Sequence, residues 1–301
     1  MSQPDWDVVI IGGGPAGLSA ALNLVRARRR VLVLDSNRPR NSATFHSHGF
    51  LSRDGVSPLE LRRLGREELE PYPNASFEKT LVSRVSVVEL ADTSPSFSID
   101  GRLTTSTVII ATGLREELPK LATLRAFYGT SIHSCMECDG YEYADLPIAL
   151  VGDSDDLAER ALLLSQWSRD LIVFTNGVGV VSEAEEVRLG ELGIRVDRRP
   201  VSDVVGDRSG VTGVVLADGE TVPRVGVFVR PRYRPVLDFV ADLALSRDDN
   251  ELIVVDDHGR TSVAGVYAIG DVTPPGPQQL IVAAGQGARV AATINRDLLG
   301  R

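Results

Sequence analysis

The stretch VVIIGGGPAGLSAALNLVRARRRVLVLD, residues 8–35, decides the fold of this chain. An apolar run over 8–11 leads into a glycine-rich turn, and an apolar-periodic stretch over 18–25 follows it. A second apolar run over 31–34 then ends in an acidic residue. Short apolar runs bounded by turn residues are typical of buried strands, and the longer periodic stretch is typical of a helix. The stretch therefore predicts a strand, a tight turn, a helix and a second strand.

The turn has the glycine spacing of a phosphate-binding loop. Gly12, Gly14 and Gly17 occupy the glycine positions of the G-x-G-x-x-G pattern. The first glycine permits the tight turn, the second lets the backbone approach a pyrophosphate, and the third lets helix and strand pack closely. Asp35 lies 23 residues after Gly12, where a carboxylate can accept hydrogen bonds from a ribose. We therefore expect this unit to bind a dinucleotide at the N-terminus of its helix.

A second unit with the same order of elements starts with PIALVGDSDDL and covers residues 147–177. The spacing from Gly152 to Thr175 is again 23 residues. Two such units in tandem predict an α/β fold with two Rossmann-like domains.

The final segment, residues 265–299, predicts a strand, a Gly-Asp turn, a proline-rich loop and a long helix. It has too few apolar residues to form a core of its own, so we expect it to pack against the N-terminal unit. The first domain would then be discontinuous, built from residues 1–115 and 236–301. Residues 116–235 would form a second domain inserted into the first.

Residues 57–73, SPLELRRLGREELEPYP, predict a further helix in the first domain. Ser57 can cap its N-terminus and Pro58 suits its first turn, whereas Pro71 would end it.

Both cysteines of the chain lie in HSCMECDGYE, residues 133–142. Cys135 and Cys138 are spaced to close a disulfide across one helical turn, and the N-terminus of a helix favours a thiolate. Thiol–disulfide exchange needs an attacking thiolate and a resolving thiol, and this pair supplies both. Asp139 could donate a proton to the leaving thiolate as a general acid.

A zinc site and a pair of inert buried cysteines are the alternatives for these two residues. Structural zinc takes four ligands. Besides the cysteines, the chain offers His46, His48, His133 and His258, and the His46-x-His48 spacing is awkward for a structural site. A segment flanked by glycine and acid is also a poor core element, so a redox pair is the favoured interpretation and no metal is expected.

The composition limits the partners. The 301 residues are 43% apolar and 24% charged, which is typical of a soluble globular protein. A net charge of −9 disfavours nucleic acid and anionic membranes. The N-terminus lacks a basic n-region and a long apolar h-region, and no apolar run approaches the roughly 20 residues of a membrane span. We therefore expect a cytoplasmic protein.

Five short motifs together resemble one known family. They are GGGPAG (12–17), IIATG (109–113), CMECDG (135–140), GVYAIGD (265–271) and QQL (278–280). In this order and spacing the chain resembles the low-molecular-weight thioredoxin reductases over essentially its whole length. The resemblance implies a homodimer with FAD bound by the first domain. The inserted domain would carry the redox cysteines and, in the parent enzymes, bind NADPH.

The resemblance also implies FAD contacts from both ends of the chain. Residues near the N-terminus would hold the pyrophosphate and adenosine, and residues near the C-terminus would meet the ribityl group and the flavin ring. The implied FAD-binding residues are Gly12, Gly14, Pro15, Ala16, Gly17, Asp35, Arg40, Asn41, Val82, Gly113, Gly270, Asp271, Gln279 and Leu280. Of the catalytic residues, Cys138 would face the flavin, Cys135 would meet the substrate, and Asp139 would be the proton shuttle.

The second Rossmann-like unit departs from the family at its turn. The turn GDSDDL, residues 152–157, keeps the first glycine only, with Ser154 and Leu157 at the positions of the other two small residues. Its three aspartates would repel a pyrophosphate, each at a cost of about 1 kcal/mol in water at ~4 Å. The next strand is followed by neither an acid nor an arginine pair, and the first basic residue is Arg188. These features predict a retained fold that no longer binds NADPH efficiently.

Two catalytic routes fit a flavin and thiol pair without NADPH. In one, a small dithiol reduces the disulfide and oxygen finally accepts the electrons; residues 41–55 resemble a loop of such dithiol oxidases, although those usually carry histidine in place of Asp139. In the other, a donor such as ferredoxin supplies electrons for a thioredoxin-like protein. The alternatives are an ordinary NADPH-dependent thioredoxin reductase and a non-catalytic flavin-binding regulatory protein.

Overall fold

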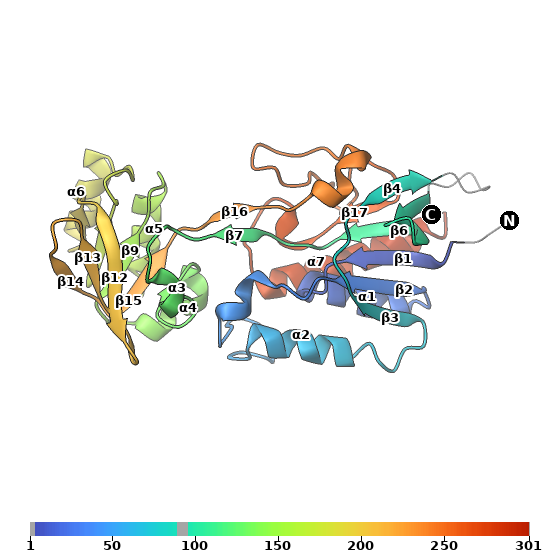
Figure 1. The fold of residues 1–301 in the computed structure, drawn as a ribbon, viewed down its shortest axis with the longest axis horizontal. Helices are drawn as coiled ribbons and strands as arrows, with labels where there is room; N and C mark the ends of the chain where they lie inside the picture. The colour runs from blue at the N-terminus through green and yellow to red at the C-terminus, as the bar shows by residue number, and fades with distance from the viewer. Residues whose placement is uncertain (1–3, 89–95, 301) are drawn as a thin grey trace. The chain divides into compact units, whose positions relative to one another are not determined.

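The computed structural model describes residues 4–88 and 96–300, and Figure 1 shows its fold. The chain forms two compact units. The flanking unit consists of Met1–Ser42, Phe50–Arg115 and Tyr233–Arg301. The central unit consists of Glu116–Arg232 together with the short segment Ala43–Gly49.

The flanking unit is built on a mostly parallel sheet with the strand order β3-β2-β1-β6-β5-β4, in which β17 also pairs with β6. β4 and β5 are the antiparallel edge, whereas β1, β2, β3, β6 and β17 run parallel. The strands are β1 (Trp6–Ile11), β2 (Val31–Asp35), β3 (Ala75–Lys79), β4 (Val85–Val88), β5 (Ser96–Ile99), β6 (Leu103–Ile110) and β17 (Val266–Ala268).

Two helices from opposite ends of the sequence pack together in this unit. They are α1 (Pro15–Arg26) and α7 (Leu280–Asp297), which lie side by side in Figure 1. The two helices approach so closely that a Cβ on Gly287 would come 2.2 Å from the carbonyl oxygen of Ala16, so the position needs glycine. The predicted strand, turn, helix and strand over 8–35 are confirmed as β1, α1 and β2.

The helix predicted over 57–73 is present but shorter. α2 covers Pro58–Glu67, and the Ser57 side chain accepts a hydrogen bond from the Glu60 amide at 3.1 Å, as the capping prediction required. The helix ends before Pro71 because the backbone after Glu67 tightens into i→i−3 turns.

The central unit contains a parallel sheet of strand order β11-β10-β9-β15-β8. The predicted unit over 147–177 is confirmed as β9, α5 and β10. The strands are β8 (Ile132–His133), β9 (Ile148–Val151), β10 (Leu171–Phe174), β11 (Arg195–Asp197) and β15 (Gly226–Val229). The helices are α3 (Leu124–Phe127), α4 (Met136–Asp139), α5 (Leu157–Leu164) and α6 (Glu183–Glu191). An antiparallel sheet of β12 (Val201–Asp207), β13 (Gly210–Leu216) and β14 (Thr221–Pro223) completes the unit.

Two short strands connect the units along the chain. β7 (Arg115–Glu117) and β16 (Arg232–Arg234) pair with each other. Within the described residues, no helix combines the length and apolar character that crossing a membrane would require.

Candidate functional site

The turn between β1 and α1 has the shape of a phosphate cradle. Gly12 has a φ of +114°, and a Cβ there would come 2.2 Å from the Ala111 carbonyl oxygen. A Cβ on Gly17 would come 2.0 Å from the Gly12 carbonyl oxygen. At Gly14, by contrast, no atom of the described residues lies within 4 Å of an added Cβ. The turn is therefore closed where the protein packs on itself and open where a ligand's phosphates would approach.

The end of β6 adds a second feature that suits a bound cofactor. The Thr112 hydroxyl is buried and has no hydrogen-bond partner among the described residues. Next to it, Gly113 has a φ of +63° and open space where a side chain would be. Buried polar atoms are nearly always paired, so an orphaned hydroxyl beside an open turn indicates a ligand. With the Gly14 opening, this arrangement fits the FAD that the sequence resemblance implies.

Asp35 is buried at the end of β2 and is paired with two arginines of α2. Its Oδ2 accepts hydrogen bonds from Arg62 Nη2 and, at 2.8 Å, from Arg66 Nη2. Arg62 also donates from Nε to the Gly13 carbonyl at 3.1 Å, and the Arg66 guanidinium lies 4.2 Å from the centroid of the Phe77 ring. Neither arginine was predicted from the sequence as a partner of Asp35, although their i, i+4 spacing places them on one face of the helix. A ribose-binding role for Asp35 stays a prediction.

The buried pair makes Asp35 important for stability. Burial lowers the pKa of the Arg62 guanidinium, and the Asp35 carboxylate counteracts that shift. Asp35→Asn would leave a buried cation without its counterion, so we expect it to lower the free energy of unfolding by about 2–3 kcal/mol. Urea denaturation measures this change. Glu60→Gln, which removes an exposed partner of Arg63, is the control and should change it by less than about 0.5 kcal/mol; equal effects would contradict the prediction.

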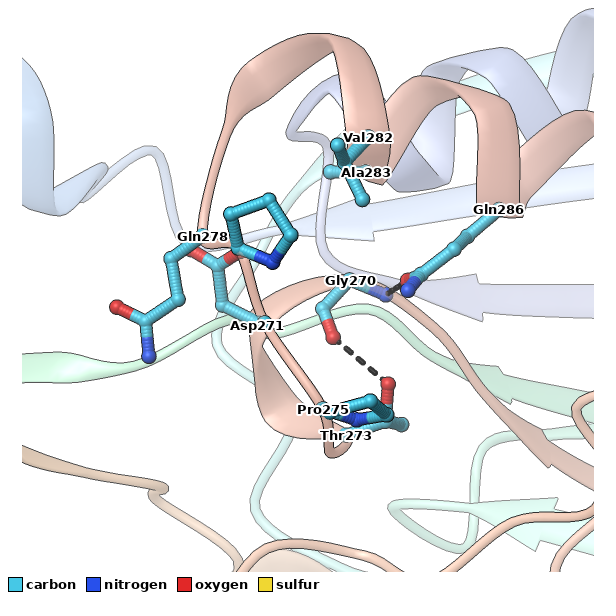
Figure 2. Close-up of a pocket in the computed structure, with 10 residues that line it drawn as sticks. Gly270, Asp271, Thr273, Pro275, Gln278, Val282, Ala283 and Gln286 are labelled. Atoms are coloured by element: carbon cyan, nitrogen blue, oxygen red, sulfur yellow. Dashed lines mark hydrogen bonds between the residues drawn. The ribbon is translucent and has the colours of Figure 1, made fainter. Parts of the chain in front are cut away.

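The C-terminal part of the flanking unit contains a small pocket, shown in Figure 2. Gly270 and Asp271 line it, as do Gln278 and Gln286. The Gly270 amide donates to Gln286 Oε1 at 2.6 Å, a contact that the sequence analysis did not anticipate. Asp271 Oδ2 accepts a hydrogen bond at 2.8 Å from Arg40 Nη2. The structure thus joins two residues, 40 and 271, that were each predicted to contact FAD.

The other predicted FAD residues lie on several elements. Gln279 caps the N-terminus of α7 and Leu280 is its first residue, while Asn41 lies in the short helix η1 (Arg40–Ala43). Pro15 and Ala16 form the first turn of α1. Val82 is buried in the core that covers one face of the sheet, so its side chain packs against protein atoms. All of these FAD contacts remain predictions.

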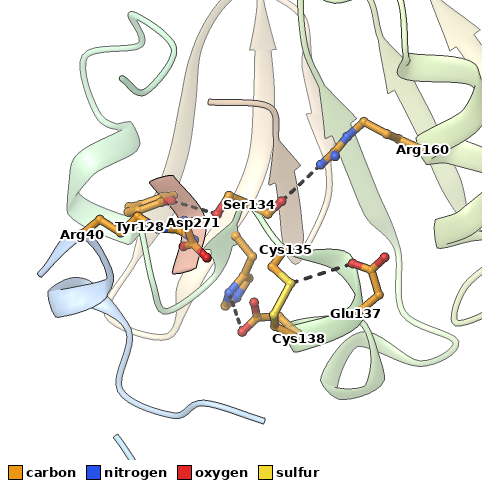
Figure 3. Close-up of a disulfide and its surroundings, with 10 residues drawn as sticks. Arg40, Tyr128, Ser134, Cys135, Glu137, Cys138, Arg160 and Asp271 are labelled. Atoms are coloured by element: carbon orange, nitrogen blue, oxygen red, sulfur yellow. Dashed lines mark hydrogen bonds and ion pairs between the residues drawn. A yellow bond between two sulfur atoms is a disulfide. The ribbon is translucent and has the colours of Figure 1, made fainter. Parts of the chain in front are cut away.

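In the central unit, Cys135 and Cys138 form a disulfide, as the sequence predicted. Cys135 occupies the N-cap position of α4, a helix of one turn, and the Cα atoms of the pair are 5.3 Å apart. Glu137 Oε2 lies 3.9 Å from Cys135 Sγ, as Figure 3 shows. A single turn carries only a small dipole and this carboxylate opposes it, so the expected stabilisation of a thiolate by the helix is weaker here than the motif suggests.

Ser134, the residue before Cys135, is held from two sides. Its hydroxyl is 3.0 Å from the Tyr128 hydroxyl, which also contacts Glu116. Its carbonyl accepts a hydrogen bond at 3.2 Å from Arg160 Nη2 of α5. Figure 3 shows both contacts. They fix the backbone that leads from β8 into the disulfide.

Asp139 contacts a buried histidine. His133 Nδ1 lies 3.1 Å from Asp139 Oδ1, and His133 Nε2 lies 3.1 Å from the Tyr143 hydroxyl. That hydroxyl donates to the Thr130 carbonyl at 3.2 Å. Burial, with smaller effects of Asp139 and Glu142, raises the pKa of Tyr143 to about 12. The sequence predicted Asp139 as a proton donor and offered His133 as a possible metal ligand, but it did not predict the contact between these two residues.

The turn before α5 is filled by protein atoms. Leu157 is fully buried, and its Cδ2 lies 2.8 Å from where a Cβ on Gly152 would be. Its Cδ1 lies 2.5 Å from the corresponding position on Gly179. Leu157 therefore fills the contact between this turn and its helix, at the position where Gly17 lets helix and strand pack closely in the first unit.

The predicted repulsion by the three aspartates of this turn is partly wrong, because two of them are paired with arginines. Asp153 Oδ2 lies 3.3 Å from Arg232 Nη2, and Asp156 Oδ2 lies 3.1 Å from Arg230 Nε. Both arginines come from the segment that returns to the flanking unit, far from the turn in sequence. Because these partners neutralise part of the charge, the turn is less repulsive than its sequence indicates. The side chain of Ser154, which donates to Asp156 Oδ1 at 2.5 Å, stands at the position that Gly14 leaves open in the first unit.

Residues 6–287 match the family described as pyridine nucleotide-disulphide oxidoreductase. The chain belongs to this family. It is 30% identical to the thioredoxin reductase of Aquifex aeolicus, a match that covers 100% of this chain and 96% of the relative. The crystal structure of HlmI matches with a TM-score of 0.90 and 38% identity, covering 98% of this chain and 93% of HlmI. A putative thioredoxin reductase TrxB from Bacillus anthracis matches with a TM-score of 0.87 and 32% identity, covering 98% and 99%.

These matches confirm the predicted family and fold class. The protein is an FAD-dependent disulfide oxidoreductase of the thioredoxin reductase type with two Rossmann-like domains. Members of this family bind FAD and generally use NADPH. Within the described residues there is no group of three or more histidine, cysteine or acidic side chains that could hold a metal ion.

Proposed function

We propose that electrons pass between FAD and the Cys135–Cys138 couple in this protein without efficient use of NADPH. The observation that carries the proposal is the turn of the central unit at the position that Gly14 leaves open in the first unit. Ser154 stands there, and its hydroxyl donates to Asp156 Oδ1 at 2.5 Å. A pyrophosphate needs the backbone of such a turn to be open to it. The central unit would then no longer bind NADPH as family members generally do, while the protein would keep the family's disulfide chemistry.

Two further features of the central unit support a lost nucleotide site. In doubly wound sheets, ligands bind at the carboxyl ends of the strands where the strand order reverses, here between β9 and β15. Arg160 reaches this edge and donates to the carbonyls of Ser134 and Val229, at 3.2 and 3.5 Å. After β10, where a 2′-phosphate would need cations, Val178 and Val180 are exposed. Arg198 reaches this segment through the Val181 carbonyl, but its guanidinium is paired with Glu186 at 2.7 Å.

The reaction of the thiol pair follows from ordinary disulfide exchange. A substrate thiolate attacks Cys135 Sγ, the bond between Cys135 and Cys138 breaks, and Cys138 leaves with the electron pair. A second substrate thiol then closes the substrate disulfide and releases Cys135. FAD, when bound, supplies the two-electron exchange with the protein dithiol. The same steps in reverse reduce a substrate disulfide.

The substrate is either a small dithiol, with oxygen as the final acceptor, or a thioredoxin-like protein, with a donor such as ferredoxin. The names of several relatives favour thioredoxin as the protein partner. The same names, with the family's general use of NADPH, favour an ordinary NADPH-dependent thioredoxin reductase as the second candidate. A cytoplasmic homodimer, expected from the sequence and the resemblance, is part of the proposal.

Anaerobic titration of the FAD-loaded protein tests the proposal. We expect dithiothreitol to bleach the flavin rapidly and NADPH to bleach it at least about 100-fold more slowly, because Ser154 and Asp156 occupy the side of the turn that a pyrophosphate would approach. Recovery of the colour on adding oxygen, with peroxide formed, would identify the oxidase route. Stopped-flow absorbance measures both rates, and calorimetry measures NADPH affinity.

Cys138→Ser is the matched control for the NADPH arm. This variant cannot pass electrons from a dithiol, but direct transfer from NADPH to the flavin does not need the thiols. Rapid bleaching by NADPH in both the wild type and Cys138→Ser, or micromolar NADPH affinity, would restore the ordinary reductase and refute the proposal.

A further inference from the structure

The contact between His133 and Asp139 goes beyond the predicted role of Asp139 alone. His133 ends β8 and is buried, while Asp139 ends α4, directly after Cys138. The two ring nitrogens of His133 face different groups: Nδ1 faces the carboxylate at 3.1 Å and Nε2 faces the Tyr143 hydroxyl at 3.1 Å. Whether each nitrogen carries a proton depends on whether its partner can donate or accept a hydrogen bond.

Tyr143 fixes the proton on Nε2. Its hydroxyl has one proton, and among the residues that the structure describes its other hydrogen-bond partner is the Thr130 carbonyl, which can only accept. Both contacts are hydrogen bonds only if the Tyr143 proton points to the carbonyl and the hydroxyl oxygen accepts from His133 Nε2–H. The raised pKa of Tyr143, about 12, keeps this proton in place at neutral pH.

The tyrosine ring is also held in position. A Cβ on Gly226 would come 2.4 Å from Tyr143 Cδ1, so the ring packs directly on the backbone of β15. Its centroid is 5.3 Å from that of His133, and both rings pack against Phe228. Because the Tyr143 hydroxyl accepts a hydrogen bond from Nε2–H, a second proton of the pair would lie between Nδ1 and Asp139 Oδ1. Without that proton, a nitrogen lone pair would face a carboxylate, which is repulsive.

We propose that His133 is a positioning residue that keeps a proton between its Nδ1 and Asp139 Oδ1, from which the leaving sulfur of Cys138 is protonated. The inference rests on the proposed thiol–disulfide function and deepens it. It assigns the proton donor to a histidine–aspartate pair in place of an isolated carboxyl group, which would already be ionised at neutral pH.

The proposed step balances. A bond forms between the substrate sulfur and Cys135 Sγ, and the bond between Cys135 Sγ and Cys138 Sγ breaks. Cys138 receives the electron pair of that bond and the proton held by the pair. The pair is left with one negative charge, and it recovers its proton when Cys138 attacks as a thiolate in the reverse direction. General-acid assistance of this kind is worth about 10²–10⁴-fold in rate.

Other charged and titratable groups lie around His133 and Asp139, and their charges affect how readily the pair loses its proton. α4 contributes Glu137 beside Cys135, and α5 contributes Arg160 beside Ser134. Glu142 lies 3.4 Å from His48 Nε2. Glu116 reaches the segment through Tyr128, and β15 contributes the uncharged Phe228.

The pH dependence of flavin bleaching by dithiothreitol tests the inference. After correction for the thiolate fraction of dithiothreitol, the wild-type rate should fall at least about tenfold as rising pH removes the proton that the pair holds. His133→Gln keeps a donor near Tyr143 and His133→Asn keeps a donor near Asp139, but neither holds a titrating proton. In both variants the flavin should be bleached about 10- to 100-fold more slowly at pH 7, and the rate should not fall further as the pH rises.

Nitrogen NMR gives a readout that does not depend on turnover. The chain has four histidines, so His133→Gln identifies the His133 signals. We expect Nε2 to stay protonated throughout and Nδ1 to respond to pH. His258→Gln, the same change at an exposed histidine, should leave the rate and the profile unchanged.

Three outcomes would overturn the inference. They are a deprotonated Nε2, an unchanged pH profile in His133→Gln, and a wild-type profile in His133→Asn, which would show that Asp139 needs only a hydrogen-bond donor. If dithiothreitol does not bleach the wild-type flavin, the proposed function fails instead, and the NMR result still tests the proton arrangement.

Discussion

Cys135→Ser and Cys138→Ser variants should each retain FAD and lose at least about a thousandfold in dithiol turnover. Exchange needs one sulfur to be attacked and another to leave, and a serine oxygen can do neither at neutral pH. The proposed FAD contacts lie in the flanking unit, whereas both cysteines belong to the central unit, so cofactor content should not change. Flavin absorbance of the purified variants and stopped-flow bleaching by dithiothreitol measure the two effects.

Met136→Leu is the control for these variants. Met136 lies between the cysteines and is buried, so a swap of similar volume preserves packing and should keep turnover within a few fold. The two cysteine variants also separate the roles of the sulfurs. Supplied with a linear disulfide such as oxidised glutathione, Cys138→Ser should accumulate a mixed disulfide on Cys135, because the Cys135 thiolate attacks the disulfide, one thiol leaves, and no second cysteine resolves the product. Mass spectrometry detects this product. Wild-type turnover in either cysteine variant would refute the mechanism, and trapping only in Cys135→Ser would reverse the assignment.

Gly17→Ala should destabilise the flanking unit by about 3 kcal/mol or more and abolish FAD retention. The added methyl would lie 2.0 Å from the Gly12 carbonyl oxygen. That oxygen belongs to the backbone of the cradle, so it cannot move aside as a flexible side chain could. Urea unfolding of the apoprotein and FAD content after dialysis measure the two effects, since bound cofactor would otherwise shift the apparent stability.

Gly14→Ala distinguishes folding from cofactor binding. Its methyl would meet no described atom within 4 Å, and a φ of −84° suits alanine. We therefore expect stability to change by less than about 0.5 kcal/mol, while FAD affinity falls at least about tenfold because the methyl occupies the open side of the cradle. Equal stability losses in the two variants would show that the cradle is not shaped as described.

The sequence by itself determined the two Rossmann-like units, the family and the disulfide. The glycine spacing at 12–17, the apolar runs beside it and the Cys135-x-x-Cys138 pair are local features, and their physical meaning depends on neighbours within a few residues. A Cβ at Gly17 meets Gly12, and a two-residue gap brings two sulfurs across one turn of helix. Such constraints can be read along the chain without knowing the fold.

Only the tertiary structure decided how the charges and the space around these motifs are used. The predicted repulsion in the second turn was overstated because Arg230 and Arg232 come from a segment about 75 residues away in sequence, and the sequence counts charges without showing which of them meet. Asp35 likewise gains its arginines from α2. The contact of His133 with Asp139 depends on how β8, α4 and β15 pack, because a buried side chain's partners are set by the surfaces that exclude water around it.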